Sequence, residues 1–186
     1  MKRILDLIIS LILLFLLFFP CIIICLLIFL DSKGPIFYKT NRIGKNKKIF
    51  RMYKFRTMKI DAPIIDSNQL QDAEKYITKL GKNLRKYSID EIPQIINILQ
   101  GHMSLVGPRP ALDTQHDLIE KRDLHGIHII RPGLTGLAQI NGRDNLSVDK
   151  KVEYDNFYKN NQTIILDIKI LIQTILVVLK SEDIKH

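Results

Sequence analysis

Disulfide pairs and the commonest active-site motifs are missing from this sequence of 186 residues. Its two cysteines, Cys21 and Cys25, lie at helical spacing inside an apolar run, where a disulfide would need non-helical geometry. A disulfide framework is therefore excluded. No Walker loop, GxGxxG or GxSxG pattern is present, which excludes the common nucleotide-binding and esterase motifs. The five histidines are scattered and no cysteine accompanies them, so no zinc site is expected.

Acidic residues are almost absent from one segment. Residues 31–60 contain ten basic side chains and one acidic side chain, and the rest of the chain is balanced. The net charge of +9 therefore comes from this segment, which is expected to bind phosphate on a lipid, a nucleotide or a nucleic acid. The composition, 46% hydrophobic and 25% charged, excludes a disordered, collagen-like or multi-span membrane chain. The length fits one domain with an appendage.

Residues 7–30 carry no charge and predict a membrane segment. The run is too long for a signal peptide, and no Ala-x-Ala type cleavage site follows it. As a straight helix it would be about 36 Å long, enough to cross a bilayer. However, Lys2 and Arg3 on one side and the basic segment on the other favour one membrane face for both ends, and Pro20 predicts a kink. These residues leave a kinked single-pass anchor and a re-entrant hairpin equally open, and Asp6 could lie among the headgroups or pair with Arg3.

The remaining sequence predicts a mixed domain of helices and strands. Short strands are expected at residues 36–38 and 49–57, joined by a basic loop at 41–48. Apolar spacing predicts a helix over 67–79, with Gly81 near its end. A long helix over 164–179 has two polar stripes on opposite sides, Lys169, Gln173 and Lys180 on one and Asp167 and Thr174 on the other. This pattern fits an interfacial helix with Asp167 turned toward the protein, and a core helix is the alternative.

Two adjacent carboxylates, Asp90 and Glu91, are the first candidates for chemistry. The sequence Ser88-Ile89-Asp90-Glu91 fits a capping box, which would put both carboxylates in the first turn of a helix and favour their ionised forms. One could attack an electrophile while the other holds a cation, because adjacent helix positions do not share a face. Three loops stiffened by proline or glycine each carry an arginine suited to binding phosphate: Arg109, Arg131 and Arg143.

Several runs resemble the bacterial sugar transferase family, the initiating monotopic phosphoglycosyl transferases. They are LRKYSIDEIPQIINIL at 84–99, GHMSLVGPRP at 101–110, YKFRTM at 53–58, LDIKIL at 166–171 and the segment 131–143. The resemblance covers nearly the whole chain. It implies an α+β fold with a re-entrant membrane helix-hairpin at 1–31 and one compact cytosolic-face catalytic domain at 32–186. That domain would hold a small β element, several amphipathic helices and a C-terminal interfacial helix at about 164–180.

The resemblance also implies a reaction. A sugar 1-phosphate would pass from a UDP-sugar to polyprenyl (undecaprenyl) phosphate through a covalent aspartyl-phosphosugar intermediate, with release of UMP, at the cytoplasmic face of the bacterial inner membrane. By position, Asp90 is the nucleophile, and Glu91 together with Asp90 would bind Mg²⁺. Membrane lipid is an implied partner, nucleic acid is not, and a homodimer is left open.

Further residues receive roles by the same resemblance and by their chemistry. Phosphate contacts are expected from Arg85, Arg109, Arg143, Lys54, Arg56 and Arg131. Supporting roles are expected for Gln139, Asp155 and Asp167, and Pro20 would form the membrane kink. Neutralisation of the donor diphosphate by Mg²⁺ and arginines would lower the barrier to attack by a carboxylate.

Three positions depart from the usual family pattern: Phe19 replaces the Ser before Pro20, His102 replaces an Asp, and Leu137 replaces a Trp. The competing hypothesis is a single-pass anchored basic protein that binds nucleic acid or anionic lipid without catalysis.

Overall fold

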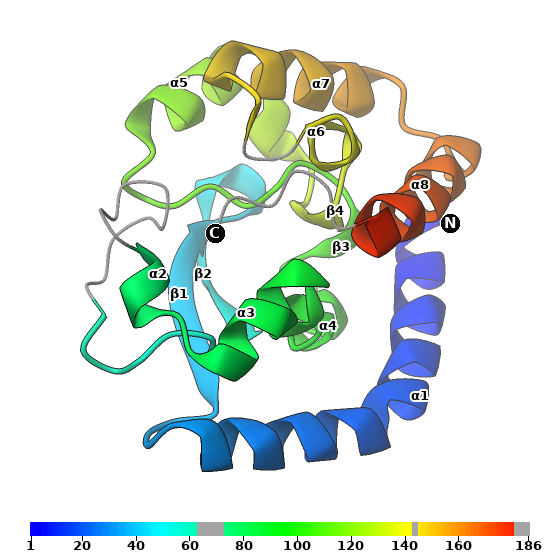
Figure 1. Ribbon diagram of the computed structural model, residues 1–186. Coiled ribbons are helices and arrows are strands. Elements are labelled where there is room, and N and C mark those ends of the chain that lie inside the picture. The colour runs from blue at the N-terminus through cyan, green and yellow to red at the C-terminus, as the bar shows by residue number, and fades with distance from the viewer. Residues whose placement is uncertain (63–72, 143–144, 181–186) are drawn as a thin grey trace.

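A mixed domain of short helices and two small sheets is framed on two sides by one long helix (Figure 1). The computed structural model describes residues 1–62, 73–142 and 145–180. In chain order the elements are α1 (Lys2–Asp31), β1 (Phe37–Ile43), η1 (Lys45–Lys47), β2 (Ile49–Phe55), α2 (Ala73–Tyr76), α3 (Lys79–Lys86), η2 (Ile89–Glu91), α4 (Gln94–Leu99), β3 (Ser104–Val106), α5 (His116–Leu124), η3 (Ile127–Ile129), β4 (Gly133–Thr135), α6 (Leu137–Ile140), α7 (Val148–Asn160) and α8 (Ile164–Lys180). The predicted mixture of helices and strands, with an apolar helix at the N-terminus, is confirmed.

The N-terminal helix α1 bends sharply part-way along its length and contains Pro20 (Figure 1). A proline removes one backbone hydrogen bond and clashes with the preceding turn, which explains the bend. Leu13 on the N-terminal arm packs onto the main core, and Ile28 on the C-terminal arm packs in a second cluster with Phe55. Both arms of the bent helix therefore contact the same domain.

Polar contacts hold the N-terminal end of α1 to that domain. Asp6, only 3% exposed, accepts a hydrogen bond from the backbone N–H of Leu105 at 3.1 Å. Lys2 forms an ion pair of 2.6 Å with Asp167 of α8. Asp6 is thus buried at the edge of β3 rather than lying among headgroups, and its hydrogen bonds go to β3 rather than to Arg3.

The first sheet is the antiparallel hairpin of β1 and β2, in which Phe37 pairs with Phe55 at the open end. Both predicted strands are confirmed, but the first is longer than expected and reaches Ile43. Pairing continues into the predicted loop 41–48 because the chain reverses within the short turn η1. There Asn46 adopts a φ of 54°, the left-handed conformation that such a tight turn needs.

The second sheet is the parallel pair of β3 and β4, with Val106 opposite Thr135. Pairing continues one residue past β3, where the N–H of Gly107 donates to the carbonyl of Thr135 at 2.9 Å. A Cβ at Gly133 would lie 2.1 Å from the nitrogen of Gly107, so this close approach of two backbones requires glycine. The loop that follows β3 is consequently fixed along one side.

The helix before the carboxylate pair differs from its prediction. The chain forms α2 and then α3, with Thr78 as the N-cap of α3, and residues 67–72 of the predicted helix lie outside the described part of the chain. Gly81 is inside α3 and not at a helix end, which corrects the expectation. A Cβ there would lie 2.1 Å from the carbonyl oxygen of Thr57, so glycine lets α3 approach the backbone after β2.

The C-terminal helix α8 confirms the two polar stripes. Asp167 faces the protein and accepts a hydrogen bond from Tyr158 at 2.6 Å, and Thr174 shares a 2.7 Å hydrogen bond with Thr135. Lys169 lies on the opposite, exposed side. The helix also exposes apolar side chains, namely Ile165, Ile168, Ile172, Ile175, Leu176 and Leu179, which a core helix would bury.

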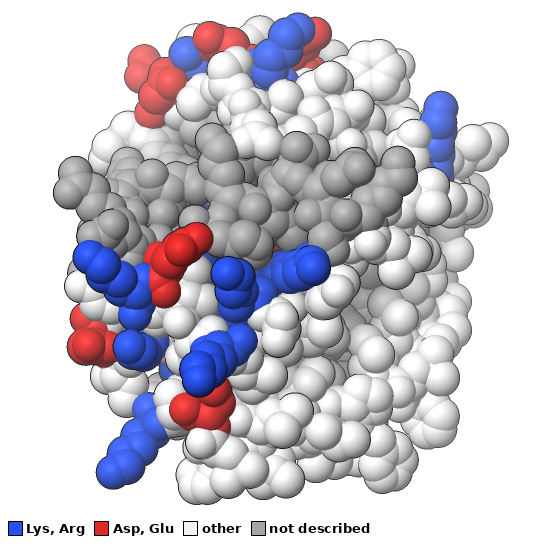
Figure 2. All heavy atoms as spheres, viewed as in Figure 1, with Lys and Arg blue, Asp and Glu red and all other residues white. Residues whose placement is uncertain are grey.

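Charged side chains are unevenly distributed over the surface. In Figure 2 they gather on the left and top, whereas the right-hand side, along α1, is almost uncharged. The exposed apolar residues of α1 run along its length, from Ile4 at 60% exposed to Leu30 at 69%. One helix in the described chain, α1, is long and apolar enough to cross a membrane by length and composition. A continuous apolar surface of this size is typical of contact with lipid or protein.

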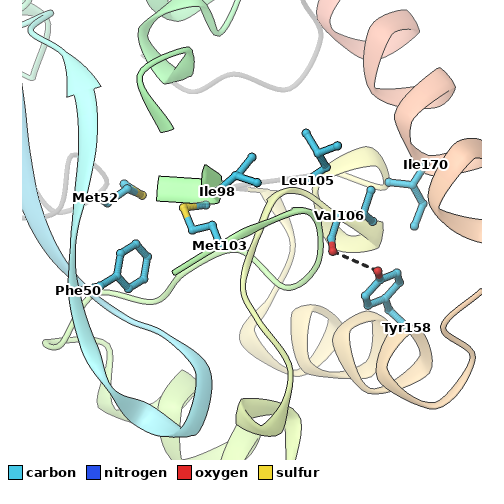
Figure 3. Close-up of a cluster of buried hydrophobic side chains, with 8 residues drawn as sticks. All are labelled: Phe50, Met52, Ile98, Met103, Leu105, Val106, Tyr158 and Ile170. Atoms are coloured by element: carbon cyan, nitrogen blue, oxygen red, sulfur yellow. Dashed lines mark hydrogen bonds between the residues drawn. The ribbon is translucent and has the colours of Figure 1, made fainter. Parts of the chain in front are cut away.

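The main core joins the hairpin to the helices on the other side of the domain. It is formed by Phe50, Met52, Ile98, Met103, Leu105, Val106, Tyr158 and Ile170, drawn in Figure 3. The Tyr158 hydroxyl donates to the carbonyl of Val106 at 3.1 Å, so α7 is also bound to β3 by a buried hydrogen bond (Figure 3). This core holds β2, α4 and β3 in fixed relation, and these elements carry or precede the polar residues described next.

Candidate active site

Asp90 and Glu91 lie on η2, the single turn between α3 and α4. Ser88, ahead of it, has a left-handed φ of 53°, and its side chain makes no capping hydrogen bond. The predicted capping box is therefore wrong: the chain turns at Ser88 before the helical turn begins, and cations from distant segments bind the Glu91 carboxylate. The two carboxylate residues are only 6% and 7% exposed, so they require cationic or hydrogen-bonding partners.

Two cations from different parts of the chain meet the carboxylate pair. Lys54 of β2 donates from Nζ to Oε1 of Glu91 at 2.8 Å and to Oδ2 of Asp90 at 3.3 Å. Arg109, from the loop after β3, donates from Nη2 to the same Glu91 oxygen at 3.1 Å. We call Lys54, Asp90, Glu91 and Arg109 the carboxylate cluster. Its formal charges balance, and each carboxylate has a cationic partner.

The cluster has a buried and an open side. The Lys54 side chain is 17% exposed and that of Arg109 is 38% exposed, while both carboxylates are at most 10% exposed. An anionic ligand from solvent would thus meet the Arg109 guanidinium at the more open side. Charge-assisted hydrogen bonds from arginine suit phosphate geometry, which makes this side a candidate diphosphate site.

Lys54 is positioned by a buried amide. Asn97 of α4, 0% exposed, accepts from the N–H of Tyr53 at 3.0 Å and donates to the carbonyl of Arg51 at 2.7 Å. The two hydrogen bonds tie α4 to the β2 backbone directly before Lys54. The side chain of Lys54 therefore starts from a fixed point when it reaches across to η2.

Other predicted phosphate-binding residues make contacts elsewhere. Arg56 donates to Oγ of Ser32 at 2.9 Å and to neighbouring carbonyls at the C-terminal end of α1. Arg131 donates to the carbonyl of Gly101 at 2.9 Å, just after α4. Arg85 donates to the Thr57 hydroxyl at 3.1 Å and to the sulfur of Met58 at 3.4 Å. Arg143 lies outside the described residues.

The three residues predicted to have supporting roles make contacts with other elements of the domain. Gln139 donates to the carbonyl of Leu134 at 3.3 Å, on β4. Asp167 binds α1 and α7 through Lys2 and Tyr158. Asp155 of α7 forms a buried ion pair with Arg122 of α5, with an N···O distance of 2.6 Å.

Burial shifts three titratable groups in this framework. It raises the pKa of the Asp155 carboxyl, and the neighbouring Arg122 guanidinium opposes that shift. Burial and the hydrogen bond to Asp167 raise the pKa of the Tyr158 hydroxyl, which therefore stays protonated. Burial, and then the charge of Arg122, lower the pKa of His128 below its usual 6.5, so that this imidazole is neutral at pH 7.

The sequence is similar to known proteins over the whole region that forms the cluster. The family model described as bacterial sugar transferase matches residues 1–181, and so includes every residue of the cluster. The chain belongs to this family. Among relatives, the uncharacterized sugar transferase EpsL of Bacillus subtilis (strain 168) is 42% identical over 186 residues, covering 100% of this chain and 91% of the relative.

Two other members of the sugar transferase family have names that state an activity. The UDP-N-acetylgalactosamine-undecaprenyl-phosphate N-acetylgalactosaminephosphotransferase of Aeromonas hydrophila is 39% identical over 158 residues, covering 82% of this chain. The UDP-glucose:undecaprenyl-phosphate glucose-1-phosphate transferase of Klebsiella pneumoniae is 37% identical over 186 residues, covering 94%. The chain spans only 37% and 39% of the length of these two relatives.

A divalent cation fits the donor chemistry of the cluster. Mg²⁺ prefers oxygen ligands and is usually held by one or two carboxylates together with substrate phosphates. Asp90 and Glu91 supply two carboxylates that already share one cation, the Lys54 ammonium. No group of three or more His, Cys, Asp or Glu side chains suited to a metal occurs in the described parts of the chain. A Mg²⁺ ion there would thus depend on the phosphates of a substrate.

The three departures from the usual family pattern lie away from the cluster. His102 stacks on Phe50 with ring centroids 5.6 Å apart, and Leu137 packs against the main core. Phe19 is 73% exposed on α1, next to Pro20.

Asn97 and Arg122 were not among the residues predicted from the sequence. A weak signal exists for Asn97, which is a polar residue flanked by isoleucines in α4 and is 0% exposed. For Arg122 there is none, because it lies in a helix rich in charged residues and only the fold shows that it is buried.

Proposed function

We propose that this chain transfers a sugar 1-phosphate from a UDP-sugar to undecaprenyl phosphate, releasing UMP and leaving an undecaprenyl diphosphate sugar. The observation that carries the proposal is the buried Asp90 carboxylate beside a second carboxylate, with Lys54 and Arg109 brought to the pair from separate segments. The activities named for two relatives of 37% and 39% identity support it.

Asp90 is the nucleophile of the proposed reaction. An oxygen of its carboxylate attacks the phosphorus nearer the sugar, and the bond from that phosphorus to the bridging oxygen breaks, so UMP leaves with the bonding electron pair. A mixed anhydride between Asp90 and the sugar phosphate remains. An oxygen of undecaprenyl phosphate then attacks the same phosphorus and releases the carboxylate. Each nucleophile attacks through an anionic oxygen, so neither step needs a separate general base.

Charge repulsion is the main obstacle to this reaction, because an anion attacks an anion. Arg109 lies at the open side, where it can bind the diphosphate, and Lys54 offsets the negative charge of the carboxylate pair. Glu91 and Asp90 would hold a Mg²⁺ ion, which neutralises the diphosphate when bound. The burial of the cluster strengthens each of these interactions by excluding water.

We also propose that α1 is a re-entrant membrane helix. Supporting this, Lys2 at its start pairs with Asp167, and the backbone carbonyl of Ile28 near its end accepts a hydrogen bond from Arg56, so both ends are bound to one domain. α8 would lie in the interface, with its exposed apolar side chains toward lipid and Lys169 toward headgroups. The domain would face the cytoplasm at the bacterial inner membrane, where UDP-sugars are found.

The test is UMP release by the purified full chain with undecaprenyl phosphate, Mg²⁺ and a panel of UDP-sugars. We expect release with at least one donor, and Asp90→Asn should lower the rate by about 10³-fold or more. Asp149→Asn, which removes an exposed carboxylate on α7, is the matched control and should leave the rate unchanged. Mass spectrometry of donor-treated protein should find the sugar phosphate on Asp90.

Two results would reject this function. A fully active Asp90→Asn variant would exclude Asp90 as the nucleophile, and the absence of UMP release with every donor would reject the transferase itself. The single-pass polyanion-binding alternative predicts the second result, together with salt-sensitive binding of nucleic acid or anionic vesicles that Asp90→Asn does not change.

A further inference from the structure

Arg122 is a buried arginine that connects two helices to the loop of the carboxylate cluster. It is 3% exposed on α5. Its Nε and Nη2 both donate to Oδ2 of Asp155 on α7, at 2.9 and 2.6 Å. The remaining arm, Nη1, donates to the backbone carbonyl of Arg109 at 2.9 Å. One guanidinium therefore holds a carboxylate on one side and the cluster loop on the other.

Arg109 is held at both its backbone and its side chain. The backbone of its loop is fixed on the β4 side, because the N–H of Gly133 donates to the carbonyl of Pro108 at 2.9 Å. On the opposite side the Arg109 carbonyl accepts from Arg122, and the Arg109 guanidinium then reaches Glu91 at 3.1 Å. An arginine side chain has many rotamers, so a fixed backbone reduces the entropy lost when its guanidinium binds an anion.

We propose that Arg122 and Asp155 form a positioning pair for Arg109: by fixing the Arg109 carbonyl they set the place of its guanidinium beside Glu91 and the incoming diphosphate. This inference rests on the proposed transferase function and deepens it. Stability alone is a weak reason to keep such a pair, because apolar residues of similar size often replace buried ion pairs without loss. What the pair provides is the position of the Arg109 backbone, since an apolar replacement leaves the Arg109 carbonyl without its hydrogen-bond donor.

The chain contains a matched control for this pair. Lys121, next to Arg122 on α5, forms an ion pair of 2.7 Å with Asp149 on α7. It joins the same two helices, but its side chains are 35% and 79% exposed. Removing it tests whether any link between α5 and α7 is enough, or whether the buried link to the Arg109 carbonyl is needed.

The experiment is a double-mutant cycle in the full chain, with UMP release as the first readout. Arg122→Met with Asp155→Val should fold and lower kcat/KM about 10- to 100-fold. In the Arg109→Ala background the same replacement should change kcat/KM by less than about threefold, because Arg122 acts through Arg109. Lys121→Gln with Asp149→Asn should have no effect in either background. Additive losses from the buried replacement would overturn the proposal.

A second readout separates this inference from the proposed function. Amide hydrogen exchange of the segment 105–112 should become faster when Arg122 and Asp155 are replaced, and should not change when Lys121 and Asp149 are replaced. Unchanged exchange would overturn the positioning role even in an active enzyme. If exchange becomes faster but the wild-type protein releases no UMP, Arg122 still fixes the Arg109 loop, and only the proposed transferase function is rejected. Arg122→Lys, which keeps a cation beside Asp155, is the second variant if the double replacement fails to fold.

Discussion

At the scale of single residues, Lys54 is the cation that contacts both carboxylates of the cluster. Its ammonium lies at 2.8 and 3.3 Å from them, while its own side chain is 17% exposed. Two like charges buried this close together repel each other, and the Lys54 ammonium offsets this repulsion. Lys54 therefore holds the two carboxylates together before any substrate or cation binds.

Replacing Lys54 should accordingly lower the rate. Lys54→Met removes the cation that offsets the repulsion between the carboxylate pair and the incoming diphosphate, so we expect kcat/KM at pH 7 to fall by about 10²-fold or more. Lys54→Arg, which keeps the charge with a different shape, should retain more activity than Lys54→Met. Steady-state UMP release by the three proteins checks this, and a wild-type kcat/KM in Lys54→Met would contradict it.

At the scale of elements, the approach of α3 to the end of β2 depends on Gly81. Alanine normally stabilises a helix interior by about 1 kcal/mol relative to glycine. Here the added Cβ would lie 2.1 Å from a backbone oxygen and 2.8 Å from two backbone carbons of Thr57, none of which is a flexible group. We therefore expect Gly81→Ala to destabilise the protein by about 2 kcal/mol or more and to lower the thermal midpoint by about 4–8 °C.

A second glycine separates this steric effect from a conformational one. Gly126 has a φ of +61°, and nothing beyond its chain neighbours lies within 4 Å of the place that an added Cβ would take. Gly126→Ala therefore carries only the cost of the left-handed conformation, about 1 kcal/mol. Thermal unfolding followed by circular dichroism should give a lower thermal midpoint for Gly81→Ala than for Gly126→Ala. The reverse order would mean that α3 can move away from Thr57 at little cost.

These elements also show what local sequence patterns can predict. The two polar stripes of α8 follow directly from helical periodicity, and both Asp167 and Thr174 face the protein as expected. The capping box at Ser88 fails because its pattern describes neighbours in sequence, whereas the Glu91 carboxylate binds cations from β2 and from the loop after β3.

The residues of the candidate site that belong to a sequence motif could be predicted. The residues that act by hydrogen bonding to distant backbone groups could not. Asp90, Glu91 and Arg109 belong to recognisable runs, and the structure brings them together with Lys54. Asn97 and Arg122 act on carbonyl and N–H groups far away in sequence, and no residue type marks such a group.

At the scale of the whole molecule, the exposed sides of the bent α1 and of α8 form apolar surfaces. The N-terminal end of α1 lies next to α8, where Lys2 pairs with Asp167, and its C-terminal arm packs on the domain where Ile28 meets Phe55. Figure 1 shows both arms along the same domain. A helix that crossed a bilayer fully would carry one of these contacts to the far side. The contacts at both ends therefore favour the proposed re-entrant helix, which would enter and leave by one face.

The proposed re-entrant helix makes a topological prediction. In a chain with Cys21 and Cys25 replaced by alanine, one cysteine is placed either in a short extension before Met1 or at the exposed Lys33. A membrane-impermeant maleimide should label both positions in inverted inner-membrane vesicles and neither in right-side-out vesicles. Labelling from opposite sides would establish a single-pass anchor instead. Pro20→Leu restores the missing backbone donor and favours a straight helix. Phe19 provides no hydroxyl that would help to hold the bend in its place. In part of the population, one of the two positions should therefore be labelled from the opposite side.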